Sequence, residues 1–435
     1  MAKAKKKATK KKKAASKAKK TSKKEEEVIV RKRPKVLTVN PTESISDQMI
    51  DYWKENDQEN VLGMFGNEDY SLGVTDIMQS GLPTLEKCIA VKLDRSCCGM
   101  PIGKMIEIFG SEASAKTTFM LYTACAIIKN GGIAFFVDFE NKFDPTWLKT
   151  IAVYHGLSDN DLKRFLYIRP DHFEWFMMWM MKAMGVIVSS KKAAKVALIK
   201  IEKKSGKKTE TEIAMIAKYK KDIDTPYAMF VDSVAAIYTE KEVLEKEETT
   251  VNVALLARQF AVKLKLVRTM IKEAKTLIVW ANQERHKIAM GGQKVRPGMM
   301  VTPGGTAIKY NCEARIRMSF AKALKRTRNG VERTYGSVYK FRIVKNQMGI
   351  PPFAEAFLRM HYDRGFYSFH SILTACADEG IIKKIGSRFK IDLQKYGVLD
   401  FEESATDEIE REYAGYHLPK ILLNIYNRKI AGAIT

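Results

Sequence analysis

The sequence predicts an α/β fold, built on a mostly parallel sheet that helices cover on both faces. Apolar strands are expected at residues 104–109, 132–139, 164–168, 227–234 and 276–283. Helical segments are expected between several of them, at residues 117–130, 144–155 and 251–273. Apolar strands that alternate with helices of this length are typical of parallel sheets buried on both faces.

The pattern changes after Asn311, where the predicted strands follow one another closely. Strands are expected at residues 315–324, 337–346 and 353–362, with a turn at Arg328-Asn329-Gly330. Short spacing of this kind predicts an antiparallel extension of the sheet. The remaining residues mix helix and short strand, which predicts a small C-terminal α+β domain.

These patterns divide the chain into four parts. We expect a disordered basic tail at residues 1–36 and an N-terminal helix and linker for subunit docking at residues 37–80. The α/β core then covers residues 81–368, with a Lys-rich insertion at about residues 185–222, and the C-terminal domain covers residues 369–435.

The net charge of +25 is concentrated in two segments of the chain. Residues 1–36 carry +14 and residues 182–222 carry +8, which leaves +3 for all other residues. The first segment has too few apolar residues to fold, and its lysines would bind polyanions by counterion release, although a localisation or solubility role stays open. The second could form one or two amphipathic helices around Ser205-Gly206. A DNA-facing surface and a solvated excursion are equal alternatives for it.

Several classes of protein do not fit the composition. No apolar run approaches the length of a membrane-spanning helix, and no apolar stretch follows the basic N-terminus as it would in a secretory signal. The cysteines are scattered and fit neither a disulfide framework nor zinc-ligand spacing, so a reducing compartment is expected. They are Cys88, Cys97, Cys98, Cys125, Cys312 and Cys376.

A phosphate-binding loop is predicted between the strand at 104–109 and the helix that follows it. Backbone N–H groups and the helix N-terminus would hold phosphates, Lys116 would reach the β- and γ-phosphates, and the Thr117 hydroxyl would bind Mg²⁺. Ala115 stands where the motif has its second glycine, and a positive φ there would cost about 1 kcal/mol. The loop residues are Gly110, Ser111, Glu112, Ala113, Ser114, Ala115, Lys116, Thr117 and Thr118.

Three carboxylates at the ends of neighbouring strands favour nucleotide hydrolysis. Asp232 ends the strand at 227–234 and would order the Mg²⁺ shell, whereas Asp138 and Glu140 end the strand at 132–139. Glu140 is placed to activate water as a general base. A small-residue turn and ordinary strand-end carboxylates are the alternative interpretation, but their combination in one chain is less common.

Six segments, taken in order, resemble the RecA family of recombinases from about Gly81 to Arg388. They are GSEASAKTT, VDFENKFDPTW, VDSVAA, IVWANQER, GGTAIKY and RIVKNQMGIP. The resemblance implies a RecA-like P-loop ATPase core with ATP and Mg²⁺ as cofactors. Ala115, the basic tail and the Lys-rich insertion indicate a phage-type or otherwise divergent member.

The resemblance also implies roles for residues around the nucleotide. Lys116, Glu140 and Lys345 would act in catalysis, with Lys345 reaching the ATP of a neighbouring subunit. Asp144 and Trp147 would line the adenine site, and Gln283 would sense the γ-phosphate. Tyr367 would cover the adenine from the neighbouring subunit. Gln347 stands where the family has a second lysine, so we expect slow hydrolysis or partial replacement by Arg342.

The segment at residues 284–303 is a predicted DNA loop, because long loops without structure of their own are often functional. In the family, the residue that matches Ile288 separates bases, while cations neutralise phosphates. Arg258 matches a further DNA contact, whereas the acidic loop at residues 239–250 is a poor phosphate binder. The predicted DNA-binding residues are Arg258, Arg285, Lys287, Ile288, Lys294, Arg296 and the helix-opening pair Gly304 and Gly305.

The function that the resemblance implies is an ATP-dependent DNA recombinase. It would form homo-oligomeric helical filaments on single-stranded DNA, hydrolyse ATP and pair the strand with homologous double-stranded DNA. It would be cytoplasmic and DNA-associated, in a nucleoid or a phage replication compartment, without a membrane partner. The alternatives are a RecA-fold helicase or mediator ATPase, and a DNA-coating architectural protein with weak ATPase activity.

Overall fold

The computed structural model describes residues 74, 76–203, 208–244, 253–286, 300–386, 388–391, 401–405 and 418–432, which all belong to one compact unit. The predicted tail at residues 1–36 and the predicted docking helix near Ser46 lie outside the described residues. So do residues 204–207, 245–252 and 287–299.

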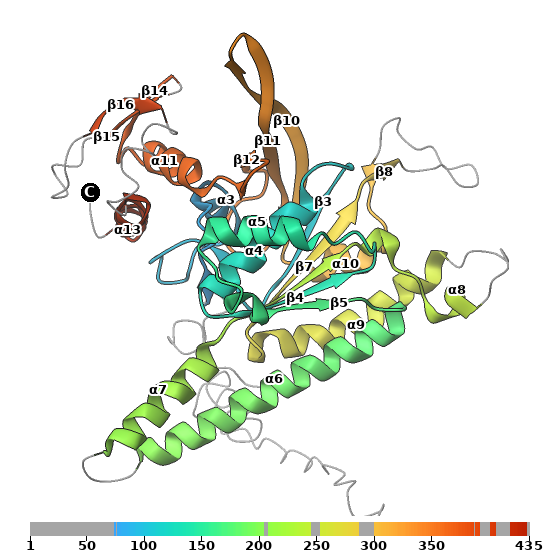
Figure 1. The fold of residues 1–435 in the computed structure, drawn as a ribbon. Coiled ribbons are helices and arrows are strands. Elements are labelled where there is room, and N and C mark those ends of the chain that lie inside the picture. Colours follow the sequence, from blue (N-terminus) through green and yellow to red (C-terminus); the bar gives the residue numbers. More distant parts are fainter. Residues whose placement is uncertain are drawn as a thin grey trace, which may run out of the picture. The chain divides into compact units, whose positions relative to one another are not determined.

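A nine-stranded sheet forms the centre of the fold, in the order β13-β12-β11-β10-β3-β7-β6-β4-β5 (Figure 1). Neighbours from β10 to β5 pair in parallel, and those from β10 to β13 pair antiparallel. The parallel strands are β3 (Met105–Gly110), β4 (Ile133–Asp138), β5 (Phe165–Ile168), β6 (Tyr227–Asp232), β7 (Thr276–Gln283) and β10 (Ala314–Arg328). The antiparallel strands are β11 (Val331–Asn346), β12 (Glu355–His361) and β13 (Gly365–Phe366). The predicted α/β class and antiparallel extension are therefore confirmed.

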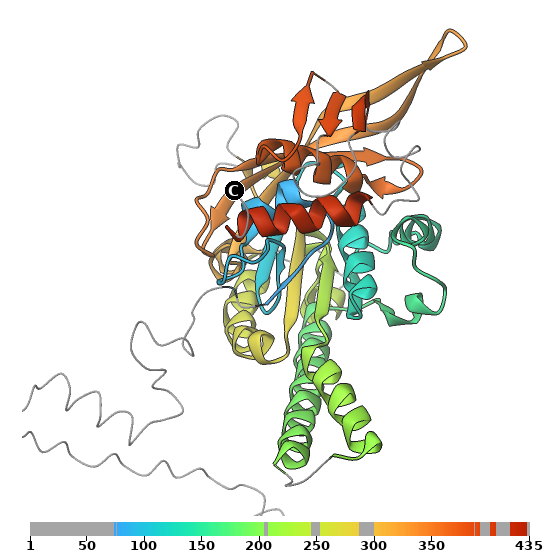
Figure 2. The same ribbon diagram turned by 90° about the vertical axis from the view of Figure 1, so that its left-hand side faces the viewer.

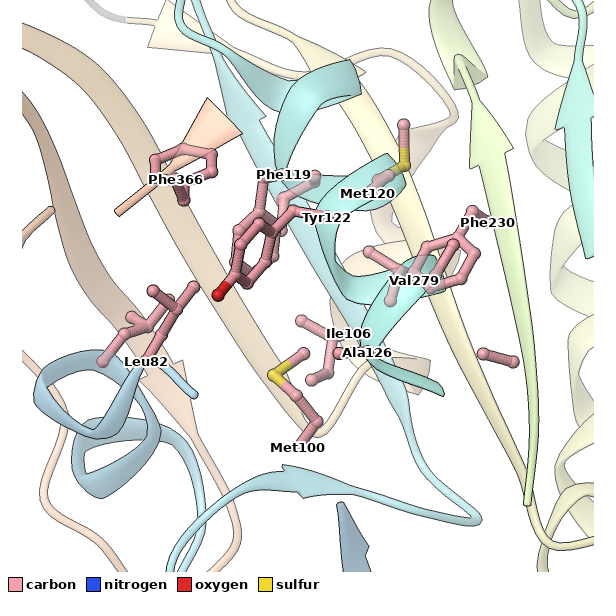
Figure 3. Close-up of a cluster of buried hydrophobic side chains, with 14 of the residues drawn as sticks. Leu82, Met100, Ile106, Phe119, Met120, Tyr122, Ala126, Phe230, Val279 and Phe366 are labelled. Carbon is pink, nitrogen blue, oxygen red and sulfur yellow. The ribbon is translucent and has the colours of Figure 1, made fainter. Parts of the chain in front are cut away.

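Helices cover both faces of the sheet, because alternate side chains of each buried strand point to opposite faces. On one face, Ile106, Phe230 and Val279 pack against Phe119 and Met120 of α4 (Lys116–Lys129), as Figure 3 shows. On the other face, side chains such as Val231 and Trp280 pack against α6 (Phe173–Glu202) and α9 (Val253–Glu273). Among the described residues, no helix is both long and apolar enough to cross a membrane.

Shorter elements complete the core. A two-stranded sheet precedes the phosphate loop, and a second one closes the base of the predicted DNA loop. The shorter helices and strands are β1 (Ile77–Met78), α3 (Pro83–Ile89), β2 (Met100–Pro101), α5 (Pro145–His155), η2 (Asp161–Arg164), η3 (Val234–Ala236), α8 (Glu240–Leu244), β8 (Arg285–His286), β9 (Met300–Val301) and α10 (Gly305–Asn311).

The C-terminal residues form a cluster of their own around Phe369, Leu373, Phe389 and Tyr426. Its elements are α11 (Ser368–Asp378), the antiparallel strands β14 (Lys383–Ile385), β15 (Arg388–Ile391) and β16 (Phe401–Ala405), and α13 (Leu418–Ile430). This mixture of helix and short strand is the one that the sequence predicts. The domain boundary at residue 369 stays a prediction, since Tyr367 and Cys98 also enter the cluster.

The Lys-rich insertion is helical on both sides of residues 204–207, in agreement with the amphipathic helices expected for it. It comprises α7 (Glu210–Asp224) and the second half of α6, which runs without a break from Phe173 in the core to Glu202 (Figure 2). A core helix is therefore prolonged into the insertion. The predicted turn between β10 and β11 is also present, with positive φ at Asn329 (52°) and Gly330 (75°).

Candidate nucleotide and DNA site

The predicted phosphate loop joins the end of β3 to the start of α4, the strand–loop–helix arrangement that such loops require. Ala113 and Ala115 have positive φ, at 56° and 62°, and the Ser114 hydroxyl donates to the Ser111 carbonyl at 2.8 Å. Gly110 has no room for a side chain, because a Cβ there would lie 2.1 Å from the Met318 carbonyl oxygen. Turns of this kind direct successive N–H groups into one concavity, where an anion can bind.

Ala115 is in the left-handed conformation that the missing glycine would favour. We therefore expect Ala115→Gly to raise the free energy of unfolding by about 1 kcal/mol, since glycine adopts positive φ without a steric penalty. Urea denaturation of both proteins measures the change. Ala193→Gly, at an exposed helical position of α6, is the matched control and should lower stability by about 1 kcal/mol. Equal stability of Ala115→Gly and the parent would argue against strain at Ala115.

The Lys116 ammonium lies inside the phosphate loop. Its Nζ donates to the carbonyl oxygens of Gly110 (3.2 Å) and Ser111 (2.7 Å) and to Ser114 Oγ (3.2 Å). Burial lowers the pKa of Lys116, and the nearby carboxylates of Asp232 and Glu140 oppose that effect. A phosphate in the loop would offer this cation a charged acceptor in place of carbonyl oxygens.

Thr117 and Asp232 meet at the predicted metal position. The Thr117 hydroxyl donates to Asp232 Oδ2 at 2.6 Å, and Asp232 is only 7% exposed at the end of β6. Burial raises the pKa of Asp232 to about 6, although the Thr117 hydrogen bond acts in the opposite direction. In the described part of the chain, no three His, Cys, Asp or Glu side chains group as a metal site. This hydroxyl–carboxylate pair fits Mg²⁺, which usually takes one or two protein ligands with substrate phosphates and water.

The raised pKa of Asp232 predicts a pH dependence for nucleotide binding. The carboxyl must be ionised to order the metal shell, so affinity for Mg²⁺-ATP should fall as pH drops from 7.5 through about 6. Titrations with a fluorescent ATP analogue and Mg²⁺ between pH 5 and 8 measure this. Asp232→Asn is the control, because protonation of the nucleotide itself affects both proteins equally. Parallel pH profiles for the two proteins would contradict the assignment.

Glu140 is held by side chains from two other strand ends. Its Oε1 accepts from Ser233 Oγ at 2.5 Å and from Gln283 Nε2 at 3.2 Å, and its Oε2 accepts from Lys142 Nζ at 3.2 Å. Burial alone would raise the pKa of Glu140, but the hydrogen bonds from Ser233 and Lys142 outweigh it and hold the pKa below its usual value. The carboxylate is thus ionised at neutral pH. Sequence reasoning placed Glu140 and Gln283 here but missed Ser233, although it directly follows Asp232.

Asp138 organises the turn that carries Glu140. Its carboxylate is 2% exposed and accepts from the backbone N–H groups of Asn141 (2.8 Å) and Phe143 (3.0 Å) and from the Tyr167 hydroxyl (3.2 Å). These donors occupy both carboxylate oxygens. Asp138 therefore positions the turn, and Glu140 is the strand-end carboxylate that faces Gln283.

The two predicted adenine-site residues lie at the start of α5. Asp144 caps this helix, accepting from the Thr146 N–H at 2.8 Å. The Trp147 indole donates to Thr118 Oγ1 of the phosphate-loop helix at 3.2 Å. Tyr367, predicted to cover a neighbour's adenine, lies in the interior of the chain. Its side chain is 1% exposed, and its ring centre lies 4.5 Å from that of His361. Covering a neighbour's adenine would require this buried ring to become exposed, so the role of Tyr367 stays a prediction.

Lys345 caps a helix within its own chain. Its Nζ donates to the carbonyl oxygens of Lys309 (2.7 Å), Tyr310 (3.2 Å) and Cys312 (2.7 Å), at the C-terminal end of α10. Burial lowers the pKa of Lys345. Arg342, the predicted substitute for the second lysine, lies 3.7 Å from Glu355. Both cations have partners within the chain, so a role at a neighbour's nucleotide requires them to exchange partners.

A buried carboxylate, Glu107, fastens both ends of the predicted DNA loop. Its Oε1 accepts from Asn282 Nδ2 at 2.9 Å, and the same Nδ2 donates to the Pro303 carbonyl at 3.0 Å. Its Oε2 accepts from Arg315 Nε at 2.5 Å, and Arg315 also donates to Thr302 Oγ1 at 3.4 Å. Glu107 is 0% exposed and lies on β3, the strand that leads into the phosphate loop. Its signal in the sequence is the single acid in the apolar run KMIEIF.

The structure places only part of the predicted DNA-binding set. Arg258 on α9 and Arg285 on β8 are exposed, and β8 pairs with β9 at the base of the loop. Gly304 and Gly305 open α10 with φ of 83° and 72°, and a Cβ on Gly304 would lie 2.7 Å from Ile308. The remaining four positions, Lys287, Ile288, Lys294 and Arg296, lie outside the described residues, as do residues 245–250 of the acidic loop at residues 239–250.

Comparison with known proteins assigns the family. A family model described as the RecA N-terminal domain matches residues 64–174 and 222–367, and its gap coincides with most of the Lys-rich insertion. The chain therefore belongs to the RecA family.

Individual proteins are also similar to this chain. Protein RecA of Lactococcus lactis subsp. cremoris MG1363 is 26% identical over 337 residues, covering 76% of this chain and 74% of that protein. Protein RecA of Treponema pallidum is 28% identical over 332 residues, covering 76% and 67%. Among solved structures, the RadB recombinase is matched at 18% identity with a TM-score of 0.40, covering 67% of this chain and 98% of that one.

Proposed function

We propose that this protein is an ATP-dependent DNA recombinase, which assembles on single-stranded DNA and pairs it with a homologous duplex. The observation that carries the proposal is the position of Gln283. Its amide contacts Glu140 at the nucleotide site, and the chain continues directly into the basic loop. Asn282, which precedes Gln283, joins Glu107 to Pro303 at the other end of that loop.

The nucleotide site supports ATP hydrolysis by residues of this chain. The loop N–H groups and Lys116 would hold the phosphates, and Thr117 with Asp232 would hold Mg²⁺, which neutralises phosphate charge when bound. Glu140 is ionised and would accept a proton from the attacking water, while Ser233 and Lys142 keep its carboxylate oriented. Trp147 would stack on the adenine, since it lies against the phosphate-loop helix.

DNA binding and ATP hydrolysis would be coupled through Gln283. When Glu140 accepts a hydrogen bond from water or another group, its oxygen is no longer available to the Gln283 amide. The residue after Gln283, Glu284, is paired with Arg317 at 2.7 Å. Because coupling between two sites is reciprocal, DNA on the loop would in turn change the affinity for ATP. In a filament, Lys345 would leave the end of α10 and reach the neighbouring subunit's nucleotide. The single lysine there would keep hydrolysis slow.

Electron microscopy and a pairing assay test this function together. We expect helical filaments on single-stranded DNA with ATP but not with ADP, and joint molecules with homologous but not heterologous duplex. Closed rings without joint molecules would instead support the helicase alternative. Coating of DNA that is independent of nucleotide would support the architectural alternative.

A further inference from the structure

The helical insertion contains a segment that extends from the described core and buries no side chain against it. We call residues 195–202 of α6, the following Lys203 and α7 the arm. Within the described residues, Ala194 is the last buried residue of α6, and α7 contains no buried residue. The two helices pack against each other instead, and a capping box between Thr209 and Glu212 begins α7. The arm is thus an ordered helical pair rather than a loop.

The base of the arm is fixed to the core by a buried lysine. Lys191 is 5% exposed, and its Nζ donates to the carbonyl oxygens of Ile223 (2.6 Å) and Thr225 (2.8 Å) at the end of α7. The first half of α6 lies in the apolar core through residues such as Phe176 and Met180. Because both helices are held at the base, the direction of the arm is set by the fold.

The arm leaves the core at the edge of the sheet opposite the nucleotide site. The nucleotide residues follow the C-terminal ends of the parallel strands, whereas α7 leads into Tyr227 at the N-terminal start of β6. Figures 1 and 2 show α6 and α7 extending beyond that edge. The strand alone separates the two edges by about 20 Å. A DNA strand held by the loop at residues 284–303 therefore lies away from the arm.

The arm and its base carry cations that the protein does not neutralise. Residues 182–222 contain 12 lysines, no arginine and four acids. Lys192 pairs with Glu273 at 2.9 Å, and Lys220 pairs with Glu202 at 3.5 Å. In the described segments of the insertion, six exposed lysines make no ion pair: Lys182, Lys195, Lys200, Lys203, Lys218 and Lys221. Lysine acts as a point charge that suits phosphate oxygens, whereas base edges are read best by bidentate groups.

A hollow at the base of the arm continues this basic surface. It has a volume of about 350 Å³, and its lining includes Arg164, Lys191 and Lys221, with Asp222 as the single acid. Arg164 and Lys221 could contact a backbone phosphate there, whereas the Lys191 ammonium donates to backbone carbonyl oxygens. The insertion offers no platform for unpaired bases, since its one aromatic residue, Tyr219, is half-buried.

We propose that the arm binds the phosphate backbone of double-stranded DNA, as a second DNA-binding surface separate from the loop at residues 284–303. A duplex carries about one negative charge per 1.7 Å of its axis, a regular and rigid array of charge that suits lysines held on two ordered helices. The inference deepens the proposed function, because it identifies where the duplex substrate would be captured. Binding at the arm would be independent of DNA sequence.

The test uses the full-length protein with Lys195, Lys200, Lys203 and Lys218 all replaced by alanine. Fluorescence anisotropy with a labelled duplex at several salt concentrations should show a slope of log affinity against log salt whose magnitude is smaller by about 3.6, or roughly 0.9 for each of the four lost contacts. Affinity at physiological salt should fall at least tenfold. Lysine-to-arginine replacement at the same positions keeps the charge and should preserve binding. The double variant Lys192→Ala, Lys220→Ala removes only paired lysines and should have a smaller effect. Circular dichroism verifies that all variants are folded.

Three outcomes separate the possibilities. Equal duplex slopes for the four-alanine variant and the parent overturn the proposal. Unchanged duplex binding with altered sedimentation of the protein also overturns it, because the arm is then a contact between subunits. The four-alanine variant can show reduced duplex binding while ATP hydrolysis by the parent does not respond to single-stranded DNA. This result supports duplex binding by the arm and contradicts the proposed recombinase function.

Discussion

Replacement of Lys116 by alanine is expected to abolish ATP hydrolysis, with a loss of at least 100-fold. The Nζ of Lys116 lies among the oxygen atoms of the phosphate loop, and no other lysine donates to those atoms in the described contacts. Its removal withdraws the cation that would neutralise charge on the β- and γ-phosphates, and loss of one such group typically costs 10²–10³-fold in rate. Phosphate release at saturating single-stranded DNA measures the effect.

Lys129→Ala is the matched control for this experiment. Lys129 lies in the last turn of the same helix, α4, and is exposed to solvent. The control should hydrolyse ATP at the parent rate, which separates the loss of the phosphate contact from a general loss of helix charge. Parent-level turnover in Lys116→Ala would refute the assignment of the phosphate loop.

Glu140→Gln is expected to reduce hydrolysis by about 10²–10⁴-fold while ATP still binds. Glutamine preserves the shape of the side chain and can still accept from Ser233, but it cannot take a proton from water. Binding of a fluorescent ATP analogue should stay within a fewfold of the parent, and filaments formed with ATP should persist because they are not dismantled by hydrolysis.

Glu332→Gln, at the exposed start of β11, controls for the loss of one carboxylate away from the site. It should hydrolyse ATP normally. If Glu140→Gln turned over ATP as fast as the parent, another group would have to activate the water. If it lost ATP binding as well, Glu140 would be a structural rather than a catalytic carboxylate.

The sequence predicted those features that depend on local patterns. Apolar runs located the central strands, and the strand predicted at residues 276–283 coincides with β7. The phosphate loop was recognisable despite Ala115, because its neighbours still have the required spacing, and the positive φ anticipated there is present. The ends of parallel strands meet at one edge of a sheet, so Asp232, Glu140 and Gln283 could be placed together in advance.

Features that depend on tertiary contacts could not be predicted in this way. Glu107 appears in the sequence as one acid in an apolar strand, and only the pairing of β3 with β7 and β10 brings Asn282 and Arg315 to it. Asp138 and Glu140 are both carboxylates and lie two residues apart, but backbone N–H groups occupy only the carboxylate of Asp138. Tyr367 matched a family position, although packing against His361 buries its ring. The continuity of α6 across the insertion also had no local signal.

ATP hydrolysis with and without single-stranded DNA is the most direct test of the account. Glu140 contacts Gln283, and Asn282 links Glu107 to Pro303 at the far end of the following loop. These contacts predict that DNA on the loop stimulates hydrolysis. We expect at least a tenfold increase in the steady-state rate of the full-length protein with single-stranded DNA, on the order of 1.4 kcal/mol in activation free energy. We also expect that Gln283→Ala loses the increase while retaining the basal rate. A basal rate that single-stranded DNA leaves unchanged in the parent would contradict the account.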